Sequence, residues 1–357
     1  MKIKAVHAWL EKLPLTKPYV IAYKTITDTE IVFFEVELEN GLTGLGASNP
    51  FSAVVGETPE VTLKNLQSGY LDEWIGKDIR RFNKLIDDAA EYFPGLPGTV
   101  AAIDIALHDL FCKFIGIPIV DLYGRKIDTL PTSVTLGIKE TAAMLEEAKG
   151  YYQLGFKILK IKTGLDVDQD IERVIKLNEY FKGKMLMRVD ANQGYAVSQL
   201  KHFIESTKQY KAELIEQPIK VGLEEQLSEL PDDDKKMLAA DESLINAVSA
   251  LQLSHPPLPY GIFNIKLMKS GGIKGAKEIA VIAKNAGIQL FWGCNDESIV
   301  SIAAALHAAY SCGNTRYLDL DGSFDLCKDF VEGGFILKDG CMLTNGLPGL
   351  GVRKLVE

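Results

Sequence analysis

From about residue 132 onwards, short apolar runs alternate with longer stretches whose apolar positions recur at helical spacing. Eight of the short runs are candidate strands: Ser133–Leu136, Ile158–Lys162, Met185–Val189, Leu214–Ile215, Met237–Ala239, Ile262–Ile265, Gln289–Trp292 and Tyr317–Leu320. Their starts lie roughly 25 residues apart, the length of a strand, a helix and two short loops. The runs are apolar throughout, as expected for parallel strands buried on both faces. Eight such units predict an α/β fold, a (β/α)8 (TIM-like) barrel rather than an open sheet.

The first part of the chain has a different pattern. Residues 31–39 alternate and are rich in β-branched and aromatic side chains, and the Asn40-Gly41 dipeptide separates them from a second short run at residues 43–47. This is the pattern of a β-hairpin. Apolar positions then recur at helical spacing over residues 59–86 and 100–114. The pattern therefore predicts a small α+β unit before the barrel.

These two patterns divide the chain into three segments. We expect an N-terminal α+β capping domain over residues 1–125 and the catalytic barrel over residues 126–323. The remaining segment, residues 324–357, is rich in Gly and Asp and has no clear place in the barrel. We expect it to return to the capping domain and complete it.

Charged residues stand at the ends of most of the expected strands. The second strand carries Lys160 and Lys162, the third ends at Asp190, the fourth at Glu216, the fifth leads into Asp241, the sixth ends at Lys266, and the eighth carries Asp319 and Asp321. The C-terminal ends of barrel strands form the face on which barrel enzymes place their active sites. A single Asp at such a position can simply cap the next helix, and a single Lys can simply face water. The whole ordered set is better explained by a shared site.

Three of these carboxylates predict a metal site. Asp190, Glu216 and Asp241 follow one another at intervals of 26 and 25 residues, one strand–helix unit each, so they meet on neighbouring strands. Converging carboxylates repel one another unless a cation lies among them. Oxygen ligands of this kind suit Mg²⁺, which keeps open positions for water or substrate. We therefore predict one Mg²⁺ per subunit.

Lys162 and Lys266 predict the chemistry at this face. The second and sixth strands are four apart in a ring of eight, so the two side chains should face each other across the barrel mouth. Two bases on opposite faces of one carbon are what a 1,1-proton transfer with inversion requires, because one removes the proton and the other returns it. Lys160 points to the same face as Lys162 and, with the metal, would lower the pKa of the basic lysine. The metal would also stabilise the enediolate formed from the substrate carboxylate.

Composition and charge restrict the partners of the protein. The chain has 357 residues, 47% of them hydrophobic, and its net charge of −9 does not favour a nucleic-acid partner. Its five cysteines form no CxxC pair. The first residues carry charges at both ends of a short apolar stretch, unlike a signal peptide, and the most apolar region, residues 299–310, is too short to span a bilayer. We expect a cytoplasmic protein with no membrane partner.

Several motifs resemble those of the enolase superfamily, specifically its muconate-lactonising-enzyme subgroup. The resemblance covers nearly the whole chain through LPLTKPY near the start, KIK at Lys160–Lys162, DANQGY, EQP, ADES, NIKLMKSGG and the closing GLPGLG. Within this subgroup, the DxD at Asp319 and Asp321 is similar to that of the dipeptide epimerases, where an acidic pair holds the α-ammonium of the substrate. The resemblance further implies that Thr135 and the loop at residues 293–298 line the substrate pocket, that Lys160 contacts substrate, and that subunits form a homo-oligomer.

The resemblance implies an isomerase, a racemase or epimerase, that acts on a small-molecule dipeptide and inverts the α-carbon of its C-terminal residue. The resemblance implies that epimerases acting on Ala-Glu carry an Arg in the N-terminal loop. At the matching position this sequence has Lys24, which cannot clamp a carboxylate bidentately. A carboxylate at Asp296 would disfavour an acidic side chain, and Tyr19, Tyr23 and Phe51 offer apolar surface. We therefore expect an Ala-Xaa substrate with small, polar or hydrophobic Xaa, and L-Ala-D/L-Glu epimerase remains an alternative.

Other activities stay open from the sequence alone. A subgroup lyase, such as a muconate cycloisomerase or an o-succinylbenzoate synthase, would keep the metal ligands and both lysines but have no use for Asp319 and Asp321. An N-acylamino-acid racemase acts on a blocked substrate without an ammonium group. A barrel that only binds a partner has no need of two opposed lysines and three acids, so the sequence favours an enzyme.

Overall fold

The computed structural model describes residues 1–21, 24–210 and 212–355. Its first part is an antiparallel sheet with β1 at Ile3–Ile21, β2 at Lys24–Leu38 and β3 at Thr43–Ser48, in that order. The predicted hairpin is confirmed, since β2 pairs with β3 and Gly41 in the turn adopts a φ of 82°, which favours glycine. Strand β1 was missed, because Pro14 interrupts its pattern; as an edge strand it tolerates a residue without an N–H.

The helices of this first part pack on the sheet. They are α1 at Ser52–Val55, α2 at Pro59–Leu66, α3 at Gly69–Asp72, α4 at Phe82–Tyr92, α5 at Pro97–Ile115 and α6 at Ile119–Leu122, with a 3-10 turn at Ile79–Arg81. Helix α5 lies against β3, and glycine makes this approach possible. A Cβ atom on Gly46 would lie 1.9 Å from the carbonyl oxygen of Ala102 in α5. Only glycine therefore fits this position without moving the helix.

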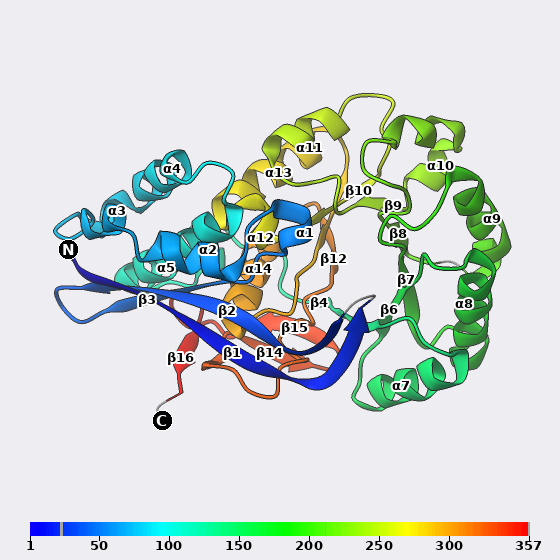
Figure 1. Ribbon diagram of the computed structural model, residues 1–357, viewed down its shortest axis with the longest axis horizontal. Helices are drawn as coiled ribbons and strands as arrows, with labels where there is room; N and C mark the ends of the chain where they lie inside the picture. The colour runs from blue at the N-terminus through cyan, green and yellow to red at the C-terminus, as the bar shows by residue number, and fades with distance from the viewer. Residues whose placement is uncertain (22–23, 211, 356–357) are drawn as a thin grey trace.

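Eight parallel strands form the second part of the molecule (Figure 1). In chain order they are β5 at Ser133–Leu136, β6 at Ile158–Lys162, β7 at Leu186–Asp190, β8 at Leu214–Glu216, β9 at Leu238–Ala240, β10 at Ile262–Ile265, β11 at Gln289–Trp292 and β12 at Thr315–Leu318. Each pairs with its neighbours in the chain, and a parallel bridge between Thr132 and Leu318 brings the first and last strands together. The predicted (β/α)8 barrel is confirmed.

Helices connect the strands around the outside of the barrel (Figure 1). They are α7 at Thr141–Gln153, α8 at Val167–Phe181, α9 at Val197–Thr207, α10 at Asp232–Lys235, α11 at Ala247–Leu253, α12 at Leu267–Ser270, α13 at Ile273–Asn285 and α14 at Ile299–Tyr310, with 3-10 turns at Lys208–Tyr210 and Glu224–Glu229. Among the described residues, no helix combines the length and the apolar character that crossing a membrane requires.

The C-terminal segment lies between the two parts. Its strands are β13 at Val331–Gly333, β14 at Phe335–Lys338, β15 at Cys341–Thr344 and β16 at Val352–Lys354. Strand β15 pairs with β4 at Leu130–Pro131, before the barrel, and Gly349 N donates to Ile117 O at 2.9 Å. Lys354 also forms an ion pair with Glu35 of β2. These contacts agree with a segment that returns to the capping domain, although the boundaries at residues 125 and 323 stay predictions.

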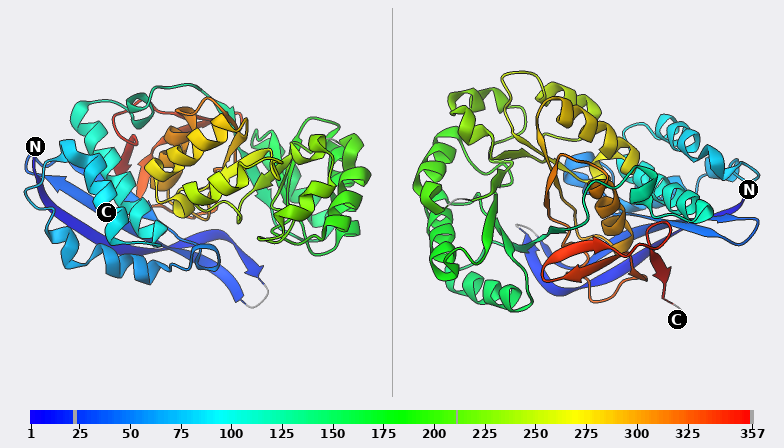
Figure 2. Two further views of the ribbon diagram at one scale, coloured as in Figure 1. Left: turned by 90° about the horizontal axis from the view of Figure 1, so that it is seen from above. Right: turned by 180° about the vertical axis from the view of Figure 1, so that it is seen from behind.

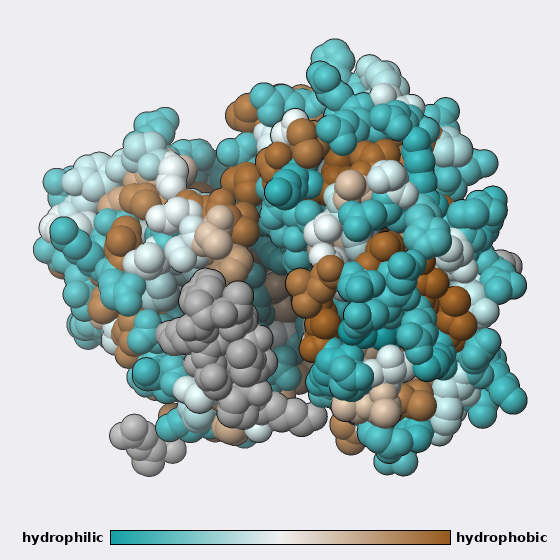
Figure 3. All heavy atoms as spheres, turned by 45° about the vertical axis from the view of Figure 1, so that its right-hand side comes forward, coloured by the Kyte–Doolittle hydropathy of each residue, from teal (hydrophilic) through white to brown (hydrophobic). Residues whose placement is uncertain are grey.

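The two parts occupy opposite ends of the molecule in the views of Figure 2, with the N-terminal helices at one end and α7–α9 at the other. Hydrophilic side chains cover most of the face in Figure 3, and apolar ones gather in a few patches. Four strands have the predicted bounds, and three others differ by one residue. The eighth was placed wrongly: it ends at Leu318, so Asp319 and Asp321 lie in the loop after it.

Candidate active site

The C-terminal ends of β6 to β10 bring the predicted charged residues side by side. In the register of the sheet Lys162 is opposite Asp190, and Asp190 is opposite Glu216. Asp241 directly follows β9, and Lys266 directly follows β10. Parallel strands end at one face of a barrel, so pattern and spacing were sufficient to predict this neighbourhood.

Lysines and carboxylates alternate along this face. Lys162 Nζ lies 2.7 Å from Asp190 Oδ2, at one end of the row. Lys160 Nζ lies 2.8 Å from Glu216 Oε2 and 3.1 Å from Asp190 Oδ2, in the middle. Lys266 Nζ lies 2.9 Å from Asp241 Oδ2, at the other end. The three carboxylates of Asp190, Glu216 and Asp241, here called the acidic row, are thus flanked by Lys162 and Lys266, the two residues predicted as bases.

The pKa values show how strongly these groups interact. Burial opposes the charge of Lys160, but Asp319, Glu216 and Asp190 outweigh it and hold the pKa of Lys160 well above its ordinary value. Burial also acts against Lys266, yet Asp241 and Glu216 raise its pKa. Burial and the charge of Asp190 raise the pKa of Glu216 to about 8, although Lys160 lowers it. The charges of Lys160 and Lys266 are therefore maintained by the carboxylates beside them.

Two residues of this site were missed by the sequence predictions. Asn264 Nδ2 donates to Glu216 Oε1 at 2.7 Å. Lys269 is buried and donates to the carbonyl oxygen of Asp241 at 2.6 Å and to its carboxylate. Asn264 could have been found, because it is a polar residue within a buried strand and lies two positions before Lys266, on the same face. The signal for Lys269 was weaker, since a lysine on a short helix usually faces water.

The acidic pair after β12 lies beside β5 and β6. Asp319 Oδ1 accepts a hydrogen bond from Ser133 Oγ at 2.6 Å, and its Oδ2 accepts one from Lys160 Nζ at 2.8 Å. Asp321 Oδ2 accepts a hydrogen bond from the backbone N–H of Thr135 at 2.8 Å. Burial and the charges of Asp319 and Asp325 raise the pKa of Asp321 to about 7. The family resemblance implied that Thr135 lines the substrate pocket. Its backbone N–H meets Asp321, and a role of its side chain in substrate binding stays a prediction.

The remaining predicted site residues lie on two other elements. Asp296, in the loop between β11 and α14, accepts hydrogen bonds at its carbonyl oxygen from Asn49 Nδ2 at 2.6 Å and from Thr29 Oγ1 at 3.3 Å. Thr29 and Asn49 belong to the capping domain, so this loop is tied to it. Tyr19 and Lys24 lie in β1 and β2. Their side chains lie outside what the structure describes, as does the whole of Tyr23.

The donor set at the acidic row suits a hard divalent cation. Asp190, Glu216 and Asp241 are buried carboxylates on successive strands, and they offer oxygen atoms only. As the side chains stand, each of them contacts a lysine, and within the described ranges no three acidic, His or Cys groups form a cluster around one metal position. The chemistry of the three groups fits Mg²⁺, and their roles as ligands stay a prediction.

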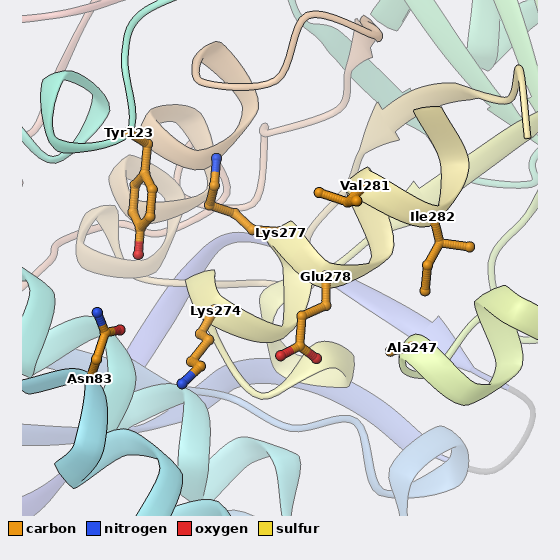
Figure 4. Close-up of a pocket in the computed structure, with 8 residues that line it drawn as sticks. All are labelled: Asn83, Tyr123, Ala247, Lys274, Lys277, Glu278, Val281 and Ile282. Carbon is orange, nitrogen blue, oxygen red and sulfur yellow. The ribbon is translucent and has the colours of Figure 1, made fainter. Parts of the chain in front are cut away.

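A groove on the outer side of the barrel is separate from this site. It has a volume of about 590 Å³ and lies along α13, where Figure 4 shows Lys274, Lys277 and Glu278 beside Val281 and Ile282. Asn83, Tyr123 and Ala247 complete its lining. The groove contains none of the charged residues at the ends of β6 to β10, so the mouth of the barrel is the candidate active site.

Two lysines and three carboxylates stand at the strand ends of this barrel, and such a set of residues is typical of an enzyme active site. Comparison with known families identifies the family to which the chain belongs. Residues 4–124 match the mandelate racemase / muconate lactonizing enzyme N-terminal domain, and residues 143–354 match the enolase C-terminal domain-like family. The chain belongs to this mandelate racemase and muconate lactonizing enzyme family of the enolase superfamily. The predicted family resemblance is therefore confirmed.

Individual relatives give a more specific comparison than the family models do. The chain is 52% identical to an L-Lys-D/L-Arg epimerase of Desulforapulum autotrophicum over 99% of this chain and 100% of the relative. It is 46% identical to a dipeptide epimerase of Methylococcus capsulatus, solved with Mg and the dipeptide L-Arg-D-Lys, with a TM-score of 0.96 and 99% of each chain covered. The L-Ala-D/L-Glu epimerase of Bacillus subtilis is 28% identical over 99% of this chain and 97% of that one. These relatives are isomerases, and the predicted enzyme class is confirmed.

Proposed function

We propose that this protein is a dipeptide epimerase that inverts the α-carbon of the C-terminal residue by a 1,1-proton transfer. The observation that carries the proposal is the acidic row of Asp190, Glu216 and Asp241, with Lys162 at one end and Lys266 at the other. The relatives named L-Lys-D/L-Arg epimerase and dipeptide epimerase, which match over essentially their full lengths, support it.

Lys162 and Lys266 are the proposed bases. Each lies at the end of its strand, and the strands are four positions apart in the sheet order. A substrate carbon between them meets one ammonium or amine group on each face, so that one lysine takes the α-proton and the other delivers a proton from the opposite side. The direction of the reaction then depends only on which lysine starts without its proton.

Asp190, Glu216 and Asp241 are the proposed ligands of one Mg²⁺ ion. Such an ion supplies positive charge that stabilises the negative charge developing on the substrate carboxylate, and it lowers the pKa of neighbouring lysines. Asn264 and Lys269 orient two of the three carboxylates through their hydrogen bonds to Glu216 and Asp241.

The acidic residues on the β11–β12 side suit a cationic substrate. Asp321 is buried beside Asp319 and Asp325, and Asp296 and Glu297 follow β11. Acidic groups gathered in a cleft attract positive charge. We propose that this side receives the α-ammonium of the dipeptide and basic side chains, as the names of the relatives at 52% and 46% identity suggest. Ala-Xaa with small, polar or hydrophobic Xaa, the substrate expected from the sequence, is the alternative. A homo-oligomeric assembly and a cytoplasmic location also stay predictions.

Solvent exchange at the α-carbon tests the function directly. The protein is incubated with Mg²⁺ in D₂O and a dipeptide library that contains Lys-Arg, Ala-Val and Ala-Glu members, and the mass of each dipeptide is followed. A turned-over dipeptide gains about one mass unit, because deuterium replaces the abstracted proton. Exchange led by basic dipeptides supports the proposal, and exchange led by Ala-Val selects the alternative.

The matched controls separate the active site from the rest of the protein. Lys236 is an exposed lysine that pairs with Asp233 on the outer surface. Lys236→Met should leave exchange unchanged, whereas Lys162→Met with Lys266→Met should abolish it. A lack of exchange in every dipeptide, with Mg²⁺ bound, would contradict the epimerase function.

A further inference from the structure

Asp319 and Asp321 stand two residues apart after β12, but their side chains meet different partners. Both oxygens of Asp319 are engaged, Oδ1 by Ser133 Oγ at 2.6 Å and Oδ2 by Lys160 Nζ at 2.8 Å. Asp321 accepts a hydrogen bond from the backbone of Thr135 at Oδ2, and its Oδ1 lies 4.0 Å from the thiol of Cys294. Asp319 therefore contacts the lysine of the acidic row, while Asp321 contacts the backbone of β5 and approaches Cys294, which follows β11.

A buried arginine donates a hydrogen bond to Ser133 and so fixes the side chain that contacts Asp319. Arg188, in β7, donates from Nη1 to Ser133 Oγ at 3.1 Å and to the carbonyl oxygen of Leu318 at 2.5 Å. Its Nε donates to Glu213 at 2.9 Å, and its side chain is 2% exposed. A serine hydroxyl that accepts from arginine keeps its own single proton to donate. The nearest acceptor for it is Asp319 Oδ1 at 2.6 Å, ahead of the carbonyl oxygen of Leu318 at 3.3 Å.

These contacts form a continuous buried chain from Arg188 through Ser133 and Asp319 to Lys160. At its upper end Lys160 contacts Glu216 and Asp190 of the acidic row. A charged hydrogen bond in a buried site is short and directional, so each member of the chain restricts the position of the next. A loss of Asp319 leaves Lys160 held by the acidic row alone.

We propose that Asp319 is a positioning residue for Lys160 and that Ser133 and Arg188 hold Asp319 in this role. The assignment rests on the proposed epimerase function and divides the DxD motif between two roles, since Asp321 belongs to the acids proposed to receive the α-ammonium of the dipeptide. Lys160 so held presents a fixed positive charge beside the reacting carbon, which serves the proton transfer rather than the binding of the amino end.

The two roles separate in steady-state kinetics on the full-length protein with Mg²⁺ and the dipeptide that exchanges fastest in the library. Asp319→Asn should lower kcat by about 10- to 100-fold, the size of a lost charge-assisted hydrogen bond, with KM within a few-fold of the unsubstituted protein. Asp321→Asn should instead raise KM by a comparable factor and leave kcat nearly unchanged, because it weakens binding of the ammonium group.

Ser133→Ala tests the chain without changing a charge. It should lower kcat in the same direction as Asp319→Asn, by about 2- to 10-fold, the size of a lost neutral hydrogen bond. Ser311→Ala is the matched control, because Ser311 is also buried and donates to a backbone carbonyl, that of Ala308, at 2.8 Å on the outer side of the barrel. Thermal unfolding midpoints of both variants show that each is folded.

The results that overturn the assignment are distinct from those that overturn the function. If Asp319→Asn raises KM and retains kcat, Asp319 binds the ammonium group and the division of the motif is wrong. If Ser133→Ala has the same kcat as Ser311→Ala, the chain has no role in positioning Lys160. A lack of exchange by the unsubstituted protein with all dipeptides contradicts the epimerase function itself.

Discussion

Acidic side chains occupy both sides of the barrel mouth, but their surroundings differ. At the ends of β7, β8 and β9, Asp190, Glu216 and Asp241 each contact at least one lysine ammonium. After β11 and β12, Glu297 and Asp321 instead accept hydrogen bonds from the backbone N–H groups of Asn295 and Thr135. Burial, with neighbouring acids, raises the pKa of Asp321 to about 7, and burial raises the pKa of Glu297 to about 7.

This difference separates two tasks. Alternating lysines and carboxylates give charges in fixed positions, which suits proton transfer and the binding of a metal ion. Acids stabilised mainly by neutral groups lack positive charge, and an incoming ammonium or guanidinium group supplies it. In the proposed function, one side does chemistry on the substrate, and the other side recognises it.

The largest effect is expected when one of the two proposed bases beside the acidic row is replaced. Lys266→Met should slow epimerisation by about 10²- to 10⁴-fold, because one face of the substrate carbon loses its acid–base group. Exchange of the α-proton with D₂O should continue for the stereoisomer whose proton faces Lys162. Chiral chromatography measures inversion, and mass spectrometry measures exchange. Inversion at the rate of the unsubstituted protein would refute the two-lysine assignment.

Added Mg²⁺ should stabilise the folded protein through the carboxylates at the ends of β7, β8 and β9, and not through the acids after β11 and β12. Mg²⁺ at about 100 times its Kd should stabilise the folded protein by about 2.7 kcal/mol, since the ion binds the folded state. The Tm measured with Mg²⁺ and with a chelator reports this shift. Asp190→Asn should remove most of the shift, while Asp321→Asn should retain it. An equal shift in both variants would place the metal elsewhere.

The second side should make stability depend on pH. The pKa of Glu297 is raised to about 7 in the folded protein, above its value of about 4.3 in the unfolded chain. Its contribution to stability is thus fully present below about pH 4.3 and is lost as the pH rises through about 7. Glu297→Gln should reduce the fall in the free energy of unfolding between pH 5 and pH 8 by about 2 to 3 kcal/mol. Urea unfolding at both pH values measures it, and an unchanged slope would contradict the raised pKa.

The smallest expected effect concerns substrate preference. Asp296→Asn should lower kcat/KM for a Lys-Arg dipeptide by about 3- to 5-fold, as for a partly exposed ion pair, and leave Ala-Val unaffected. Asp233→Asn, at an exposed acid that pairs with Lys236, is the control. Equal losses with both dipeptides would mean that Asp296 shapes the loop and does not select the substrate side chain.

Much of the site was predictable because a barrel converts sequence spacing into position. The intervals between Asp190, Glu216 and Asp241 correspond to neighbouring strands, and the structure places the first two directly opposite each other in register. Asp319 and Asp321 were assigned to the eighth strand, but β12 ends earlier, at Leu318. The apolar Leu320 between them misled that prediction, because a loop residue packed into a core has the same pattern as a strand residue.

The sequence by itself determined the barrel, its order of strands and the identity of the charged groups at its mouth, since these follow from periodicity and spacing along the chain. Only the tertiary structure decided which charges meet. Arg188 and Ser133 lie 55 residues apart, and Ser133 and Asp319 lie 186 residues apart. Contacts over such separations depend on how side chains pack inside the closed barrel, and no local pattern records them.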